Sequence, residues 1–193
     1  MSMQPRALPA FKMPTYHLKD TLIDHKSITN KKYTAPIFIQ ANEFSKVSNL
    51  NNYKWKVIDG LGYSEASMTL SPYENSLFSN DLPYLEYTFD TEEIGNYTIE
   101  IRCIPTHSNN YDHQVGVQVN GQNHMNHPIN TRGRSEEWKQ NVLRNYTPVL
   151  YNATFKKIGP QTLRIDVNQP GIVIDQIAIY PEKQKDFYEI IKQ

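Results

Sequence analysis

Residues 115–121 read Val-Gly-Val-Gln-Val-Asn-Gly. Valines at every second position give a β-strand one apolar face, because successive side chains of a strand point to opposite sides. The closing pair Asn120-Gly121 tolerates the positive φ angles of a type I′ turn, which joins two antiparallel strands. This stretch therefore predicts a β-hairpin.

The same alternation recurs along the chain. Apolar side chains at every second position predict strands at residues 85–89, 97–103 and 163–167. The run Ile172–Ile179 is apolar on both faces, which is typical of a central strand. Because these strands do not alternate with helices, the predicted fold class is all-β, an antiparallel β-sandwich of about eight to ten strands.

The sandwich is expected to span residues 34–181, between two flanking segments. Residues 1–33 contain scattered prolines and no sustained period, which predicts a linker or wrapping arm. Residues 182–193 follow a proline and place apolar residues at helical spacing, which predicts a C-terminal helix. Within the sandwich, Ser135 precedes two glutamates, a capping pattern that predicts a short helix near 135–145.

Composition excludes several classes of partner and site. The 193 residues include 20 Lys+Arg and 20 Asp+Glu, so the basic surplus of a duplex-binding protein is absent and no nucleic acid is expected as a partner. No apolar stretch is long enough to cross a membrane, and no signal segment opens the chain. The single cysteine, Cys103, excludes an internal disulfide and is expected to be a small core residue rather than a nucleophile.

Several sequence elements occur in a familiar order. Residues 55–62 read Trp-Lys-Val-Ile-Asp-Gly-Leu-Gly, and residues 138–145 read Trp-Lys-Gln-Asn-Val-Leu-Arg-Asn. Later come Gln-Thr-Leu-Arg-Ile at 161–165 and Asn-Gln-Pro-Gly-Ile-Val-Ile at 168–174. From about Ala35 to Pro181, this series resembles the C-terminal β-sandwich domain of glycoside hydrolase family 115, the xylan α-glucuronidases.

The resemblance implies a non-catalytic accessory domain. Catalytic machinery in that family lies in upstream domains, which would be partners of this chain within a secreted or periplasmic parent protein. The domain would bind a polysaccharide or oligosaccharide, namely glucuronoxylan or its uronic acid branches. Two alternatives remain open: a structural or docking domain that buttresses the catalytic domains or forms a dimer contact, and a loop at 131–137 that reaches into an active site built elsewhere.

More loosely, the layout resembles the jelly-roll, galactose-binding-like carbohydrate-binding modules of families 6 and 35. Those modules commonly hold a structural calcium with acids of an opening Glu-Ala-Glu strand and a late aspartate. Here the strand reads Gln40-Ala41-Asn42, and Asp175 alone matches the late aspartate. Amides in place of carboxylates weaken a site for a hard cation, so neither calcium nor another cofactor is expected.

No catalytic or zinc constellation is apparent. Glycoside hydrolysis needs two facing carboxyl groups, and no pair shows a motif among the candidate acids Asp59, Glu65, Asp112, Glu136 and Glu137. His124 and His127 are three residues apart, but they follow the predicted hairpin turn with no third ligand in pattern, so we expect loop histidines.

Sugar binding requires an aromatic platform beside hydrogen-bonding side chains. The predicted platforms are Tyr53, Tyr63 and Tyr111. The predicted amide partners are Asn109, Asn110, Asn168 and Gln169. For the carboxylate of a uronic acid, Arg132 and Arg134 offer forked donors.

Overall fold

The computed structural model describes residues 34–74, 76–108 and 110–182. The predicted arm over residues 1–33 lies outside these ranges. So does the predicted C-terminal helix, apart from Glu182, which stands in a turn.

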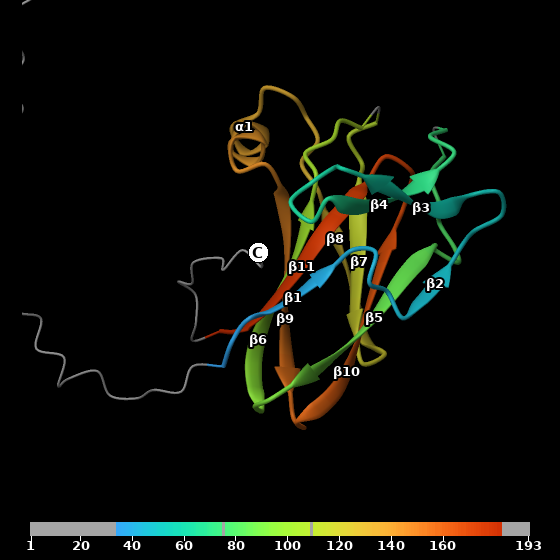
Figure 1. Cartoon of the computed structure of the whole chain (residues 1–193). Helices are drawn as coiled ribbons and strands as arrows, with labels where there is room; N and C mark the ends of the chain where they lie inside the picture. The colour runs from blue at the N-terminus through green and yellow to red at the C-terminus, as the bar shows by residue number, and fades with distance from the viewer. Residues whose placement is uncertain (1–33, 75, 109, 183–193) are drawn as a thin grey trace, which may run out of the picture. The chain divides into compact units, whose positions relative to one another are not determined.

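Two antiparallel sheets make up the described part of the chain (Figure 1). The first sheet has the order β3-β4-β11-β6-β9, and β1 also pairs with β11; the second has the order β2-β5-β10-β7-β8. The strands of the first sheet are β1 (Ile37–Gln40), β3 (Lys54–Asp59), β4 (Ala66–Ser71), β6 (Gly95–Cys103), β9 (Thr147–Phe155) and β11 (Val173–Pro181). Those of the second are β2 (Lys46–Ser48), β5 (Tyr84–Thr91), β7 (Gln114–Val119), β8 (Gln122–Pro128) and β10 (Gly159–Val167).

The predicted antiparallel sandwich is confirmed, and its core lies between the two sheets. The alternating apolar residues of β5, β6, β7 and β10 are buried there. The strand β11 is central as predicted, because it pairs with β6 on one edge and with β4 and β1 on the other. Eleven strands appear in the described residues, more than expected, since β2 has only three residues and β8 shows no apolar alternation.

The predicted hairpin joins β7 to β8. Asn120 and Gly121 both have positive φ angles, 51° and 69°, as a type I′ turn requires. The expectation of loop histidines after this turn was wrong, because His124 and His127 lie on β8 itself. His124 contacts Asp166 of β10, whereas the ring of His127 packs against Tyr151 of β9. Their side chains therefore point to opposite faces of β8.

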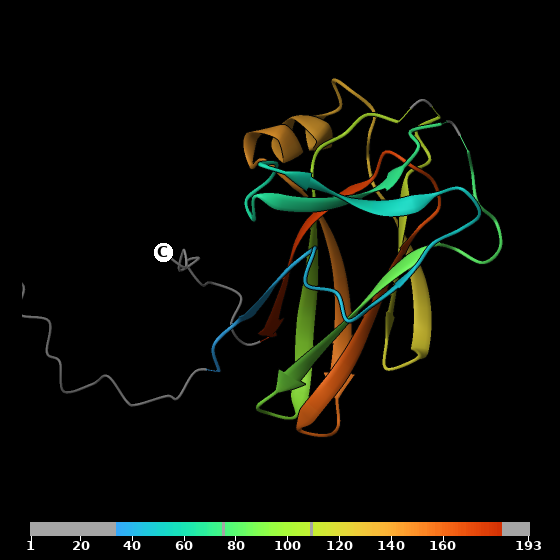
Figure 2. The same ribbon diagram turned by 45° about the vertical axis from the view of Figure 1, so that its right-hand side comes forward.

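The predicted short helix is α1 (Glu136–Leu143). The side chain of Ser135 accepts a hydrogen bond of 3.2 Å from the backbone N–H of Trp138, which caps the helix. The helix ends before Asn145, whose φ of 64° breaks the helical course. Figure 2 shows β3 and β4 crossing the direction of the other strands at the end of the sandwich where α1 lies. In the described residues, no helix is long and apolar enough to cross a membrane.

Candidate functional site

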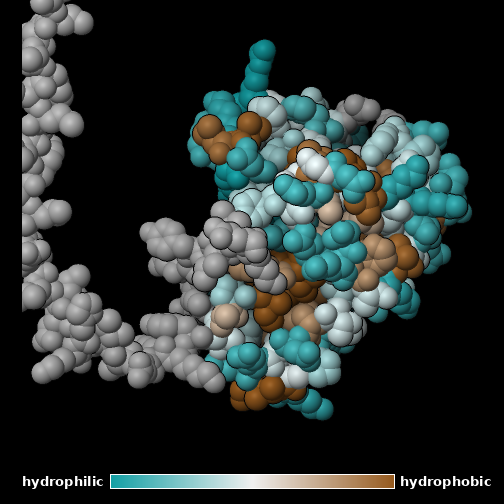
Figure 3. All heavy atoms as spheres, viewed as in Figure 1, coloured by the Kyte–Doolittle hydropathy of each residue, from teal (hydrophilic) through white to brown (hydrophobic). Residues whose placement is uncertain are grey.

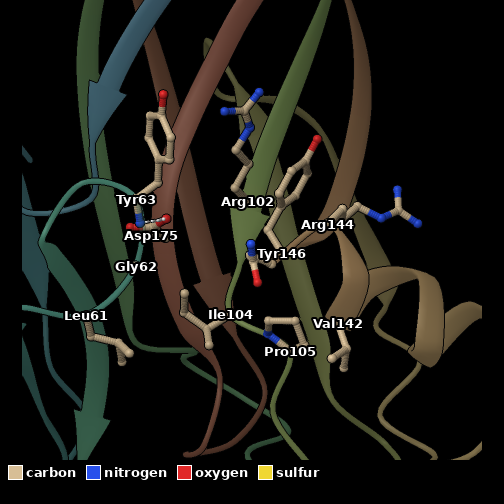
Figure 4. Close-up of a pocket in the computed structure, with 11 residues that line it drawn as sticks. Leu61, Gly62, Tyr63, Arg102, Ile104, Pro105, Val142, Arg144, Tyr146 and Asp175 are labelled. Carbon is tan, nitrogen blue, oxygen red and sulfur yellow. Dashed lines mark hydrogen bonds between the residues drawn. The ribbon is translucent and has the colours of Figure 1, made fainter. Parts of the chain in front are cut away.

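A cavity of about 590 Å³ opens between the β3–β4 loop, β6 and the end of α1. Its volume is in the usual range for small-ligand sites. Its lining residues include Tyr63, Arg102, Val142, Arg144, Tyr146 and Asp175. We call this cavity the Tyr63 pocket. Figure 4 shows Tyr63 and Asp175 on one side of it, Tyr146 and Arg144 on the other, and Arg102 between them.

Tyr63 supplies the most accessible aromatic surface of the pocket. Its side chain is 52 % exposed. Its backbone N–H donates a 2.8 Å hydrogen bond to Oδ2 of Asp175, so the backbone that carries the ring is tied to the central strand. An exposed ring on an anchored backbone is the arrangement that a sugar platform needs.

An irregularity in β11 positions Asp175 to accept this hydrogen bond. The pairing of β11 with β6 shifts register between Ile174 and Gln176. Such a bulge re-aims the side chain at its centre. The buried Asp175 carboxylate then accepts hydrogen bonds from the backbone and hydroxyl of Ser64, at 3.2 and 2.7 Å, besides the bond from Tyr63.

The opposite wall of the pocket is cationic and aromatic. The guanidinium of Arg102 lies 4.9 Å from the ring centroid of Tyr146, and that of Arg144 lies 5.9 Å from it. Arg102 also forms an ion pair with Glu100 at 2.8 Å, which balances its charge. Arg144 is exposed at the rim, and among the described residues it forms no ion pair with a carboxylate.

Two phenols beside this wall, those of Tyr146 and Tyr180, have a pKa above the ordinary value. Burial raises the pKa of Tyr146, and the nearby Glu100 carboxylate raises it further. The same two causes raise the pKa of Tyr180 to about 12. Both side chains are hydrogen-bond donors at neutral pH, as an ordinary tyrosine is.

The residues considered for calcium do not fit that ion. Gln40 and Asn42 flank Ala41, whose N–H bonds to the carbonyl of Asp175 at 3.0 Å, so the three candidates do lie near one another. However, Asp175 is the only carboxylate among them, and its oxygens already accept from the loop at residues 63–67. The described residues hold no group of three or more His, Cys, Asp or Glu side chains arranged for a metal.

Tyr53 is buried rather than exposed, which corrects its prediction as a sugar platform. Its side chain is 6 % exposed, its ring edge packs on Phe78, and its hydroxyl bonds to Ser76. Tyr53 lies in a polar stretch of sequence, which wrongly suggested an exposed side chain. That stretch folds back through a bridge between Leu50 and Tyr53 and carries the ring inward.

The amides of Asn168 and Gln169 are likewise buried and already paired, so they differ from the expected free hydrogen-bonders. Both donate to the carbonyl of Asp112, at 2.6 and 2.7 Å. Gln169 also donates to the side chain of Asn110 at 3.2 Å. These bonds hold the loop before β7 in place; Asn109 lies outside the described residues.

A second exposed surface is formed by Tyr111 and Arg132. Tyr111 is 54 % exposed, and the Arg132 guanidinium lies 5.0 Å from its ring centroid. Arg134 is exposed nearby in sequence, with a φ of 68°. The predicted residues are thus divided, because Tyr63 lines the pocket described above while Tyr111 does not.

Residues 35–189 match the family model of the glycosyl hydrolase family 115 C-terminal domain. The chain belongs to this family. No curated protein matches it in sequence. Cys103 is buried on β6, and burial raises the pKa of its thiol to about 12. Little reactive thiolate therefore forms at neutral pH.

Solved structures of similar fold include whole enzymes and isolated modules. One is a family GH115 4-O-methyl-α-glucuronidase with specificity for decorated arabinogalactans, at 23 % identity and a TM-score of 0.60. The match covers 79 % of this chain and 18 % of that enzyme. Another is a family 35 carbohydrate-binding module from Clostridium thermocellum, at 14 % identity and a TM-score of 0.51, covering 77 % of this chain and 99 % of that one.

A third is the GH26-CBM35 β-(1,4)-mannanase of Podospora anserina, at 17 % identity and a TM-score of 0.50. That match covers 82 % of this chain and 30 % of the mannanase. These likenesses establish the jelly-roll sandwich that this family 115 C-terminal domain adopts.

Three residues of the pocket were not predicted as site residues: Arg102, Arg144 and Tyr146. Arg102 lies on the polar face of β6 with Thr98 and Glu100, so the alternating pattern did not distinguish it as a site residue. Arg144 and Tyr146 follow α1, and only the fold brings them opposite Tyr63.

Proposed function

We propose that this chain is a non-catalytic accessory domain that binds carbohydrate in the Tyr63 pocket. The observation that carries the proposal is the exposed ring of Tyr63, anchored through its backbone to Asp175 and facing a cavity of about 590 Å³. A pyranose ring stacks on such a surface through its apolar face, while its hydroxyls bond to the polar wall.

The charge of the pocket favours an acidic sugar. Arg144 stands exposed at the rim without a carboxylate partner among the described residues, and its forked donors suit a carboxylate. Uronic acid branches of glucuronoxylan carry such a group. The parent protein would then be a secreted or periplasmic xylan α-1,2-glucuronidase, whose upstream domains perform the hydrolysis.

A non-catalytic role accords with the placement of the candidate acids. All five carboxylates considered for hydrolysis are exposed, and two of them are engaged on α1 with neighbouring side chains. Because all five are exposed, they lack the contrast in environment that a general acid and a nucleophile need. We expect no release of uronic acid from aldouronic oligosaccharides by the purified chain.

Docking onto the parent enzyme is the second candidate function, and one observation favours it. Val142 and Leu143 on α1 are 41 % and 75 % exposed, and Figure 3 shows an apolar patch over this helix. Exposed apolar patches commonly mark interaction surfaces. Because Val142 also lines the pocket, a docked domain would compete with sugar there.

The test compares two oligosaccharides that differ only in a uronic acid branch. Calorimetric titration of the purified chain should show binding of the branched xylo-oligosaccharide, with a Kd nearer millimolar than nanomolar, since a shallow site buries little of the ligand. Arg144→Gln should remove the preference for the branched sugar, and the matched variant Arg132→Gln should keep it. Equal affinity of both oligosaccharides for the unaltered chain would contradict the acidic specificity.

A further inference from the structure

The helix α1 buries a polar side chain and leaves its apolar ones in water. Asn141 is the only residue of α1 that is buried, at 1 % exposure. Val142 and Leu143, which follow it, are 41 % and 75 % exposed. A helix at the surface of a domain ordinarily turns its apolar face to the core, so α1 gains little hydrophobic stabilisation from its position.

The polar atoms that α1 and its approach segment bury are unsatisfied. Neither the oxygen nor the nitrogen of the Asn141 amide has a hydrogen-bond partner among the described residues. The same holds for the indole Nε1 of Trp138, one turn earlier on the helix, and for the hydroxyl of Thr131, in the segment that leads into it. All four atoms are buried, so water does not reach them while the helix is docked. Each therefore costs free energy in this position.

A stack of two rings joins Thr131 and the helix in one cluster. Nδ1 of His107 donates a 3.2 Å hydrogen bond to the carbonyl of Thr131. The His107 ring stacks on that of Trp138, with the centroids 4.9 Å apart. His107 is itself exposed, so water competes for this contact. The stack and the contacts between α1 and β9 hold the helix in its docked position.

The backbone bends sharply on both sides of α1. Arg134, just before the cap residue Ser135, has a φ of 68°, and Asn145, just after the helix, has a φ of 64°. Positive φ angles are uncommon for residues other than glycine. Hinges consist of a few residues at the ends of an element that absorb changes in backbone angles. Arg134 and Asn145 are therefore the bends about which α1 would move as a unit.

Movement of α1 would change the Tyr63 pocket. Val142 at the end of α1 and Arg144 just after it line one side of this cavity (Figure 4). On the other side, Tyr63 belongs to the β3–β4 loop and Asp175 to β11, and neither is part of the helical segment. Displacement of α1 therefore separates the two sides and widens the entrance to the cavity.

We propose that α1 is a lid of the Tyr63 pocket, and that its docked position is only marginally stable because buried atoms of Thr131, Trp138 and Asn141 are unsatisfied there. Lifting the helix lets water bond to all four atoms, which offsets the loss of the His107–Trp138 stack and of the contacts with β9. The role of the lid in admitting a sugar rests on the proposed function of the pocket, whereas the opening of the helix does not.

Two indole N–H groups in the same molecule provide the test. The chain has two tryptophans, and Nε1 of each is buried without an acceptor among the described residues. Trp138 lies on α1, whereas Trp55 lies on β3 of the sandwich. Hydrogen exchange of the ¹⁵N-labelled full chain, followed by NMR, should be about tenfold or more faster at the Trp138 indole than at the Trp55 indole, since only the helix has to lift.

Removal of one unsatisfied atom should keep the lid closed for longer. Thr131→Val keeps the shape of the side chain and removes its hydroxyl, and its position outside the helix leaves helix propensity unchanged. It should slow exchange at Trp138 about tenfold and leave exchange at Trp55 unchanged. Thr162→Val, at an exposed position on β10, is the matched control and should change neither.

The same variant tests whether the lid admits the sugar. Association of the uronic acid-branched xylo-oligosaccharide, measured from NMR line shapes, should slow in Thr131→Val by the same factor as exchange, because fewer molecules are open. Exchange at Trp138 that is as slow as at Trp55, or that Thr131→Val does not slow, would overturn the proposal. An association rate that does not follow exchange would overturn the lid as a gate. If the oligosaccharide does not bind the unaltered chain, the proposed function fails, and the exchange rates still decide whether α1 opens.

Discussion

Gly62 lies directly against Asp175, so that a Cβ at Gly62 would be 2.2 Å from the Oδ1 atom of that carboxylate. The φ of Gly62 is 84°, which side chains rarely adopt. Space and backbone together therefore require glycine where the β3–β4 loop meets the central strand. This contact gives a physical reason for the second glycine of the element Trp-Lys-Val-Ile-Asp-Gly-Leu-Gly.

Replacing this glycine should destabilise the domain more than replacing its neighbour. Gly60 also has a positive φ, 72°, but nothing lies within 4 Å of its absent Cβ. We expect Gly60→Ala to cost about 1 kcal/mol from backbone strain alone. Gly62→Ala adds a steric conflict with Asp175 and should cost about 2–4 kcal/mol. Urea unfolding of both variants measures the difference, and equal losses would contradict this role of Asp175.

Chelation should leave the thermal stability unchanged. The Asp175 carboxylate is held by the loop at residues 63–67, and Gln40 and Asn42 bring amides instead of further charge. A metal bound only to the folded state at a hundredfold excess over its Kd would add about 2.7 kcal/mol. Melting curves with EDTA and with calcium should therefore coincide. A drop in Tm with EDTA that calcium reverses would show that a metal site has been missed.

Cys103 should resist thiol reagents while the domain is folded. It is fully buried on β6, and burial raises its pKa to about 12, so little thiolate forms at neutral pH. Labelling with a disulfide reagent should proceed only after denaturant unfolds the chain. Rapid labelling without denaturant would mean that β6 opens locally.

Acid should weaken the fold through His113. Burial lowers the pKa of His113 below its ordinary value of 6.5. The unfolded chain then binds a proton more readily than the folded one. The free energy of unfolding should therefore be highest above pH 6.5 and decrease as the pH falls below it. His127, whose pKa burial also lowers, acts in the same direction.

Unfolding titrations across this pH range test the assignment. His113→Gln should reduce the slope of the free energy of unfolding against pH. An unaltered slope in His113→Gln would place the pH dependence elsewhere.

Local sequence patterns were sufficient to predict β5, β6, β7, β10 and β11 and the turn between β7 and β8. Alternating valines report burial of one face, and Asn120-Gly121 reports the turn through backbone conformation, so both signals are local. The extent of β8 could not be predicted from its own residues, because they show no apolar alternation. Pairing with β7 stabilises it, and that contact is not visible in its own sequence.

The site was less predictable because it depends on contacts distant in sequence. Tyr63 was predicted as a sugar platform and is exposed, but Asp175, which anchors its backbone, comes 112 residues later. Asn168 was expected to be a free hydrogen-bonder, yet its amide is engaged with Gln114 and Asp112. Composition shows which side chains could bind a sugar, and tertiary hydrogen bonds decide which of them remain available.

The most direct test of sugar binding in the Tyr63 pocket is the affinity of two tyrosine variants for a glucuronic acid-branched xylo-oligosaccharide. Tyr63 and Tyr111 are similarly exposed, at 52 % and 54 %, and only the first lines the pocket. Loss of one stacking surface of this kind costs about 1–3 kcal/mol in comparable ring contacts, so Tyr63→Ala should weaken binding about tenfold or more. Tyr111→Ala should bind as the unaltered chain does. Unchanged affinity in Tyr63→Ala, with loss of affinity in Tyr111→Ala, would contradict sugar binding in the Tyr63 pocket.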